Sequence, residues 1–500
     1  LLAVNHEFTD PVMMFLDYTP GSPTERQVKT ELAAQGVSIV EVVRSANGEW
    51  SYDITSRFNH RTTSDTEMEI TGPAAGHPLL MVSDDPTGTK VRGTLNNCAA
   101  GKTPWGSLLT CEENFNQYFA NLSSLASSDP RKAMHSRYGL TSGASERRWE
   151  LFIKRFDIAK EPNEPFRFGW VVEIDPYNPN FVPKKRTALG RLKHEAATTT
   201  IAKSGQAVVY TGDDERFDYM YKFVSKGKFN RTNRQENFNL LDEGTLYVAK
   251  FNDDGSGEWL PLIAGQGPLA SMSQAEILIN TRAAADLVKA TKMDRPEDIE
   301  INPINGKLYC VFTNNTRRGA SGNPGIDKAN PRANNRHGHI IELTEKDNDS
   351  AATSFNWEIF ILCGDPANAD DKAFFAGFDM TRVSAISSPD NIVFDKRGNL
   401  WIATDGQPGT FKKNDGIYAV PVAGDERGFL RQFLSAPVAA EICGPEFTPN
   451  NETLFCAIQH PGEGGKVAAP ISTWPDGTTP ARPSVVAIVK TSDGSKVIGK

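Results

Sequence analysis

Four segments of the chain repeat one pattern, and this repeat constrains the fold more than any other feature. Each segment is a short run of β-branched and aromatic residues that stops at a cluster of polar residues. The runs and their polar stops are Gln206–Thr211 with Gly212–Glu215, Gly306–Thr313 with Asn314–Asn315, Gly398–Thr404 with Asp405–Gly406, and Glu452–Ile458 with Gln459–Glu463. Such repeats are typical of β-propeller blades, which stack around a channel because one blade cannot bury its own faces. The sequence therefore predicts an all-β, propeller-like fold.

The composition is that of a globular protein with a large core. The 500 residues are 39% hydrophobic and 23% charged, and the formal net charge is -8. No basic surface for nucleic acid is expected, and no apolar run is long enough to span a membrane. The six cysteines form no CxxC pair and are too few for a disulfide scaffold. Zinc-ribbon and thioredoxin-like sites are therefore not expected.

We expect a single propeller domain over residues 1–500, because no flexible linker separates independent units. The spacing between repeats is irregular, so the blades must carry insertions. The candidate insertions are about residues 121–165, 267–292 and 316–336. Ser273 and Glu276 form a capping box that predicts a helix in the second, and the Gly, Asn and Pro content of the third predicts a loop.

The two ends of the chain each contain a predicted strand. Leu1–Val4 begins the chain as a strand-like run, and Ser484–Val489 is a second apolar run near its end. We predict that these runs pair and close the ring of blades. No targeting peptide is visible, so the residues alone do not indicate a compartment.

If each repeated run is the inner strand of its blade, the polar stops meet at one mouth of the channel. Carboxylates that are distant in the sequence would then converge on one place. Unpaired carboxylates at close range repel one another strongly, so bound cations are the natural compensation. The acid excess of the chain agrees with cation binding.

One acidic strand end also contains a thiol. In Thr110–Asn114 a cysteine and two glutamates follow the apolar run Trp105–Leu109. Carboxylates suit hard cations such as calcium, whereas the Cys111 sulfur favours a transition metal such as iron or zinc. The alternative is a buried Cys111 followed by solvated Glu112 and Glu113. The recurrence of acidic strand ends elsewhere favours the metal interpretation.

A second charged turn is Gly190–Ala196, which precedes a predicted strand. Glu195 in this turn is a candidate metal ligand. The neighbouring His194 is a candidate ligand or proton donor, although a single histidine usually has neither role. The alternative for the whole segment is a solvated loop.

A third charged segment, Asp294–Glu300, combines acids with a guanidinium. Pro296 disfavours a helix at Arg295, so an extended backbone is expected. In that geometry Glu297 and Asp298 point opposite ways, so one of the two can bind a metal while Arg295 offers a planar fork to an oxyanion. The alternative is a surface ion-pair cluster.

Acidic residues also stand at strand ends in the last third of the chain. Asp390 precedes the run that begins at Gly398, Asp405 ends that run, and Glu446 holds the equivalent place one blade later. Each alone means little, because Asp and Asn are common turn residues. Asn5–Glu7 follows the first strand and is a candidate for one more polar stop, although a solvated strand end is the expected interpretation of Glu7. The sequence contains no GxSxG elbow, P-loop, HExxH motif or EF-hand loop.

Several short motifs together give the chain a family resemblance. They are Leu95–Ala99, Thr103–Gly106, Thr110–Phe115, Gly169–Asp175, Lys193–Glu195, Gly212–Phe217, Arg295–Asp298, Asp390–Asn391 and Gln459–Glu463. In this order the chain resembles the PhoX-type alkaline phosphatases over about residues 95–465. The resemblance implies a six-bladed propeller-like fold that hydrolyses phosphate monoesters, with some tolerance for diesters. It also implies two ferric ions joined by a bridging oxo group, and calcium ions, at one channel mouth.

The resemblance implies roles for individual residues. Cys111 would bind iron through its thiolate, Glu195 and Glu297 would bind or bridge the metals, and Arg295 would hold the phosphate. The remaining acids would be calcium or outer ligands, namely Glu112, Glu113, Glu215, Asp390, Asp405 and Glu446. Lys102 precedes one motif without belonging to it, so a phosphate-binding role stays open beside the alternative of a solvated side chain.

The family is exported by a twin-arginine signal, so the resemblance implies a periplasmic or secreted protein. The expected partners are small phosphate esters, and a monomer is expected.

Two other functions remain open from the residues alone. Gly398–Gly406 also resembles the blade sequence of calcium-dependent propeller lactonases, which need no thiolate ligand. The third alternative is a non-enzymatic propeller scaffold whose acids lie on the surface. Iron with calcium would favour the phosphatase, calcium alone the lactonase, and no tightly held metal the scaffold.

Overall fold

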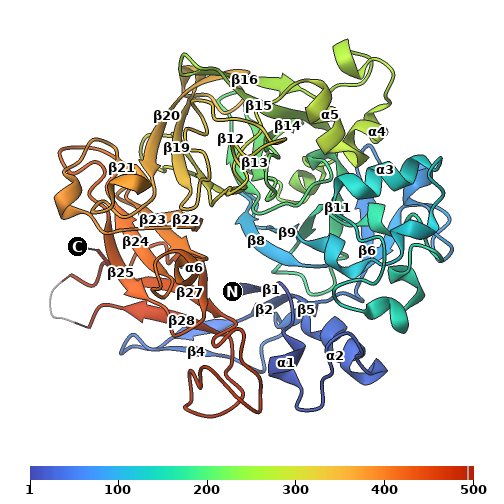
Figure 1. The fold of residues 1–500 in the computed structure, drawn as a ribbon, viewed down its shortest axis with the longest axis horizontal. Coiled ribbons are helices and arrows are strands. Elements are labelled where there is room, and N and C mark those ends of the chain that lie inside the picture. Colours follow the sequence, from blue (N-terminus) through green and yellow to red (C-terminus); the bar gives the residue numbers. More distant parts are fainter. Residues whose placement is uncertain (492–494, 500) are drawn as a thin grey trace.

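The computed structural model describes residues 1–491 and 495–499. Its strands form sheets that stand around a common axis (Figure 1). The first group contains β1 (Leu2–His6), β2 (Gly36–Val40) and β5 (His60–Thr62), with the hairpin β3 (Val42–Arg44) and β4 (Trp50–Tyr52) as a separate sheet. The second is a six-stranded sheet in the order β7 (Lys90–Arg92), β6 (Glu67–Thr71), β11 (Lys184–Arg186), β10 (Val171–Ile174), β9 (Leu108–Glu112) and β8 (Asn97–Lys102).

The largest sheet consists of two meanders joined at their outer edges. The first meander is β12 (Thr198–Ile201), β13 (Gln206–Gly212), β14 (Met220–Lys228), β15 (Gly244–Phe251) and β16 (Ser256–Pro261). The second is β17 (Pro296–Ile301), β18 (Leu308–Phe312), β19 (His339–Glu345), β20 (Ser354–Leu362) and β21 (Phe374–Phe375). β16 and β20 pair in an antiparallel arrangement and make the join.

Two smaller sheets complete the ring. One is β22 (Pro389–Phe394), β23 (Leu400–Thr404), β24 (Gly416–Val420) and β25 (Arg431–Ser435), and the other is β26 (Glu441–Phe447), β27 (Thr453–Gln459) and β28 (Ser484–Val489). The inner edge strands of neighbouring groups contact one another: β1 with β8, β8 with β12, β12 with β17, β17 with β22, and β22 with β26. The all-β, propeller-like fold is confirmed. The number of six blades stays a prediction, because β16 and β20 join two of the groups into one sheet.

The repeated runs form the second strand of each group, not the inner strand that we expected. They lie on β13, β18, β23 and β27, and β18 and β23 are buried throughout. A strand covered on both faces reads as a continuous apolar run, whereas the strand that faces the channel is partly polar. Antiparallel pairing still places the polar stops at the mouth where the inner strands begin, as Pro296 opposite Phe312 and Pro389 opposite Thr404 show.

The ring does not close through the predicted pairing of the two chain ends. β28 pairs with β27, and β1 pairs with β2. The reason is that each end strand continues the antiparallel meander of its own sheet. A cavity of about 1060 Å³ lies between these sheets and is lined by side chains such as Val4, Val40, Phe455 and Val485.

Short helices lie in the connections between strands. They are α1 (Pro11–Met14), α2 (Glu25–Ala34), α3 (Pro130–Arg137), α4 (Gln274–Ile279), α5 (Thr281–Leu287) and α6 (Gln407–Thr410). α4 begins at the capping box that the sequence predicts, with Ser273 as its N-cap and Glu276 as the reciprocal partner. Residues 316–336 contain no helix or strand, although the structure describes all of them. Among the described residues, no helix has the length and apolar content that crossing a membrane requires.

Candidate metal centre

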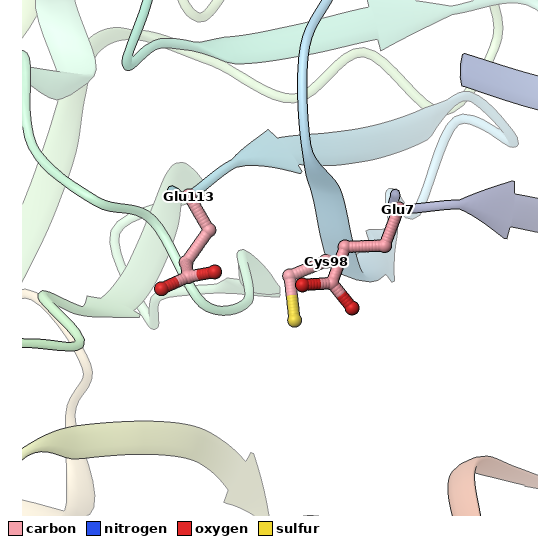
Figure 2. Close-up of side chains that lie close together, drawn as sticks. All are labelled: Glu7, Cys98 and Glu113. Carbon is pink, nitrogen blue, oxygen red and sulfur yellow. The ribbon is translucent and has the colours of Figure 1, made fainter. Parts of the chain in front are cut away.

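Six side chains from distant parts of the chain meet at the mouth where the inner strands begin. They form two groups, Glu7 with Cys98 and Glu113, and Glu195 with Asp214 and Glu297; within each group the ligand atoms lie within 4.8 Å of one another. Figure 2 shows the first group, in which the three side chains come from different segments and face a common space. The groups adjoin, because Cys98 Sγ lies 3.2 Å from Glu195 Oε1.

β-Bulges turn three of the inner strands at this mouth. The pairing register shifts at Asn97/Ala100 in β8, at Pro296/Ile299 in β17 and at Pro389/Ile392 in β22. Cys98, Glu297 and Asp390 lie inside these shifts. A bulge adds one residue to a strand and redirects its side chains, and bulges are common beside active sites. The bulges therefore direct these three side chains toward the same place.

Ionisation of the clustered acids is strongly unfavourable unless a bound cation compensates their charge. Burial raises the pKa values of Glu113, Glu195 and Glu297 well above the usual range, and neighbouring carboxylates such as Asp214 raise them further. Burial raises the pKa of the Cys98 thiol, and the carboxylates of Glu195 and Glu7 raise it further. A bound cation reverses this balance by favouring the ionised forms. Glu113 Oε1 is buried and has no hydrogen-bond partner among the residues that the structure describes, so a metal ion that coordinates this oxygen would fit the site.

A second layer of acids surrounds these six residues. Burial raises the pKa values of Asp390 and Glu441 well above the usual range. The negative charge of Asp405 raises both pKa values further. Asn391 Nδ2 donates to Glu195 Oε1 at 3.3 Å, and Gln459 Nε2 donates to Glu7 Oε2 at 2.9 Å. Such amide contacts orient carboxylates that bind metals.

Arg295 lies at the same mouth and points its guanidinium into the acidic cluster. Its Nε and Nη2 atoms donate to the two carboxylate oxygens of Asp214 at 2.8 and 2.6 Å. Nη2 also lies 3.3 Å from Glu297 Oε1. A planar guanidinium beside a candidate metal site can bind two oxygens of a phosphoryl group at once.

The structure does not bring Cys111 to the centre, contrary to the sequence-based expectation. Its side chain is fully buried in a hydrophobic cluster with Leu109, Val171 and Val209. Cys111 belongs to β9, the strand next to the inner edge of its sheet, whereas Cys98 belongs to β8, the inner edge strand. The thiol at the mouth is therefore the one that precedes the apolar run.

Glu112 is also separated from the centre. Oε1 accepts hydrogen bonds from Lys185 Nζ at 2.7 Å and from the Leu95 amide at 3.3 Å. Oε2 accepts from the amides of Gly169 and Trp170 at 3.0 and 3.1 Å. Alternation along β9 places Glu112 on the face opposite Cys111, whereas Glu113 lies beyond the strand end and turns into the mouth.

Three other predicted residues form ion pairs instead of joining the two groups. Glu215 Oε2 lies 3.1 Å from Lys193 Nζ, and although burial raises its pKa, Lys193 lowers it to about 2. Glu446 lies 2.7 Å from Lys102, and their side chains are 47% and 70% exposed. Lys102 lies four residues along β8 from Cys98, which corresponds to ~13 Å. The pair therefore lies away from the centre, and the exposed Lys102 agrees with the alternative of a solvated side chain.

His194 does not point a free nitrogen at the centre. Its Nδ1 lies 2.9 Å from Thr211 Oγ1, and its Nε2 lies 2.9 Å from the Gly190 carbonyl oxygen. Both ring nitrogens are therefore occupied, and His194 is a buried structural residue.

Sequence reasoning missed four members of the mouth. Glu7 was expected to be a solvated strand end, and Cys98, Asp214 and Glu441 received no role of their own. Cys98 and Glu441 lie on the inner strands β8 and β26, and Asp214 lies in the polar stop after β13. Their position in the sequence could have indicated them, because each of these three is a polar residue close to the mouth end of a strand.

The interpretation of Glu112 gives a first prediction. Glu112→Gln leaves Lys185 buried without its counter-ion, so the free energy of unfolding should fall by about 3 kcal/mol or more. Urea denaturation measures this change. The control Glu446→Gln breaks an exposed pair and should change the free energy of unfolding by about 1 kcal/mol at most. If Glu112→Gln lost bound metal at unchanged stability, Glu112 would be a ligand after all.

Comparison with known proteins identifies the family. A family profile described as alkaline phosphatase PhoX matches residues 1–462. The chain belongs to the PhoX alkaline phosphatase family. The solved structure of Pseudomonas fluorescens PhoX in complex with vanadate, a transition state analogue, is 41% identical with a TM-score of 0.90, over 97% of this chain and 84% of that one. The resemblance that the motifs indicated is confirmed.

Other solved structures are much less similar. A putative gluconolactonase is 9% identical with a TM-score of 0.25, over 59% of this chain and 71% of that one. A protein from Lactobacillus plantarum is 9% identical with a TM-score of 0.26, over 74% of this chain and 65% of that one. No curated protein matches the chain. Such weak similarity carries no functional argument, so the lactonase alternative gains no support.

Membership of the PhoX family establishes the class of activity. The chain is a phosphatase of the alkaline phosphatase type, and its substrates are small phosphate esters. The activity is metal-dependent, which agrees with the two groups of clustered ligand atoms.

Proposed function

We propose that this phosphatase hydrolyses phosphate monoesters, with some tolerance for diesters, at a centre that contains both iron and calcium. The observation that carries the proposal is the position of Cys98 Sγ, 3.2 Å from Glu195 Oε1 among buried carboxylates. A soft thiolate selects a transition metal, whereas the surrounding carboxylates suit calcium. The family resemblance supports two ferric ions joined by a bridging oxo group.

The proposed ligands divide between inner and outer positions. The inner ligands are Glu7, Cys98, Glu113, Glu195, Asp214 and Glu297. Asp390, Asp405 and Glu441 are proposed as calcium or outer ligands, since their carboxylates interact with the inner ones. Bound cations would neutralise the phosphoryl oxygens and supply a deprotonated nucleophile at neutral pH.

Arg295 is proposed to bind the phosphoryl group. Its guanidinium is held by Asp214 through two hydrogen bonds, so its direction is fixed before the substrate arrives. A fixed cation is most useful where negative charge develops in the transition state. The vanadate bound to the Pseudomonas fluorescens relative supports a site of this kind. Asn391 and Gln459 are proposed to orient the carboxylates of Glu195 and Glu7.

The place of action is proposed from the family resemblance. The protein would act in the periplasm or outside the cell after twin-arginine export, and it would do so as a monomer. Size-exclusion chromatography with light scattering tests the monomer, and a dimer mass would contradict it.

A metal analysis paired with an assay tests the proposed centre. The purified protein should contain both iron and calcium, and it should hydrolyse p-nitrophenyl phosphate faster than the bis(p-nitrophenyl) diester. A chelator that removes calcium should abolish the activity, because the acids would again repel one another. Calcium without iron in a fully active protein would contradict the mixed centre.

A further inference from the structure

The backbone at Arg295 adopts an uncommon conformation. Its φ angle is +58°, which is in the left-handed region that residues with a side chain rarely occupy. Such a conformation is strained for a residue with a side chain and persists only where the surrounding structure holds it. The residue proposed to bind phosphate is therefore held in place by its neighbours.

The carboxylate of the preceding residue, Asp294, is fully buried and has several partners. Oδ1 accepts hydrogen bonds from Arg318 Nε at 2.8 Å and from Asn315 Nδ2 at 2.9 Å. Oδ2 accepts from Asn335 Nδ2 at 3.0 Å. Arg318 is itself fixed, because its Nη2 donates to the Lys292 carbonyl oxygen at 2.7 Å. Asp294 therefore has little freedom to move.

Main-chain hydrogen bonds hold both sides of the same segment. The Phe217 amide donates to the Met293 carbonyl oxygen at 2.9 Å, and the Thr313 amide donates to the Arg295 carbonyl oxygen at 3.2 Å. Arg216 and Asp294 also form an isolated antiparallel bridge. The backbone is thus fixed before and after the strained residue.

Two of the three donors lie in residues 316–336, and the third lies at the base of this insertion. Asn315 and Asn335 exchange main-chain hydrogen bonds of 2.6 and 3.1 Å, which closes the loop at its base. None of the loop residues belongs to a strand of the ring. The loop adds no blade, but it surrounds the carboxylate next to Arg295.

We propose that Asp294 is a positioning residue: together with the loop donors that hold its carboxylate, it fixes the direction of the Arg295 side chain toward the phosphoryl group. The inference rests on the proposed role of Arg295. Asp294 itself has no contact with substrate in this scheme. Its effect passes through the φ angle of the next residue and the guanidinium that this angle directs.

The test is a double-mutant cycle between Arg318 and Arg295. Arg318→Met should lower kcat/KM for p-nitrophenyl phosphate by about tenfold, because a small misplacement of a catalytic group is costly. In the Arg295→Ala background the same change should cost less than about twofold, because the two residues act as one unit. Inhibition by vanadate should weaken in parallel, while the metal content stays that of the wild type.

Each contrary outcome has a separate meaning. Equal losses from Arg318→Met in both backgrounds would overturn the positioning role. A loss of metal in Arg318→Met would also overturn it, because the loop would then support the metal centre. If Arg295→Ala alone had no effect, the proposed role of Arg295 would fail, and the inference would fail with it.

Three further variants separate positioning from folding. Arg318→Lys retains a cation near Asp294 and should restore activity to within about threefold of the wild type. Asn315→Ala removes one donor to Asp294 but keeps the ion pair between Asp294 and Arg318, so it replaces Arg318→Met if that variant does not fold. The loss of kcat/KM that Asn315→Ala causes should again disappear in the Arg295→Ala background. The matched control is Arg155→Met, which breaks a buried pair with Glu164 at 3.4 Å elsewhere. It should lower stability without changing kcat/KM of the folded enzyme.

Discussion

Cys98→Ser should yield a protein that has lost most of its iron and whose phosphatase activity has fallen by ~10²-fold or more. A serine hydroxyl is a harder donor than a thiolate and stays protonated at neutral pH, so it cannot replace the sulfur. The geometry makes this sulfur central, because it belongs to one group of ligand atoms and lies 3.2 Å from Glu195 of the other. The measurements are elemental analysis and any visible band from thiolate-to-iron charge transfer.

The matched control is the same substitution one strand away. Cys111→Ser places a hydroxyl in a hydrophobic cluster, which should lower the free energy of unfolding by about 1–3 kcal/mol. The metal content of the folded fraction should not change. Iron that stays in Cys98→Ser but leaves in Cys111→Ser would return the ligand role to Cys111, as the sequence motif had suggested.

The propeller-like fold was accessible from the sequence because its signal is repeated. The second strands β13, β18 and β23 are almost wholly buried, and β27 buries alternate residues; each contains an apolar run that ends at a polar stop. Repetition compensates for the weakness of each segment. The inner strands were missed because a strand with one polar face carries a weaker signal. The closure of the ring was wrong because strand pairing depends on distant contacts.

The centre was only partly accessible for a related reason. Glu195 and Glu297 lie together in the structure, and the sequence offered both as metal ligands, from two charged segments and from the family resemblance. The position of Cys98 depends on a bulge, and an added residue changes which face a side chain takes without leaving a clear trace in the sequence. The exclusion of Glu112 depends on four donors from three segments, which only the folded chain brings together.

Family resemblance and geometry contributed different parts of the functional conclusion. The motifs indicated the PhoX family but attached the thiolate to the cysteine inside the more prominent motif. The structure places both cysteines and separates them by contact, with Cys111 packed in a hydrophobic cluster and Cys98 Sγ grouped with the ligand atoms of Glu7 and Glu113. A motif that names a chemistry therefore does not by itself say which of two nearby residues performs it.

Arg295→Ala should lower kcat for p-nitrophenyl phosphate by ~10²-fold, which corresponds to about 3 kcal/mol of transition-state stabilisation. The metal content should stay that of the wild type, because the candidate ligands are other side chains. Vanadate should inhibit the variant less strongly, since it imitates the transition state in the Pseudomonas fluorescens relative. Arg295→Lys should recover only part of the rate, because an ammonium group cannot bind two oxygens in one plane.

The control for this variant is a cation outside the centre. Lys102 pairs with Glu446 at 2.7 Å, and its side chain is 70% exposed, so Lys102→Ala should leave kcat/KM within about twofold of the wild type. A large loss in Lys102→Ala would restore its predicted role in phosphate binding. An Arg295→Ala enzyme that kept both its full rate and its vanadate inhibition would show that the guanidinium serves only to balance Asp214 and Glu297. The positive charge at the mouth would then stabilise the folded protein instead of the transition state.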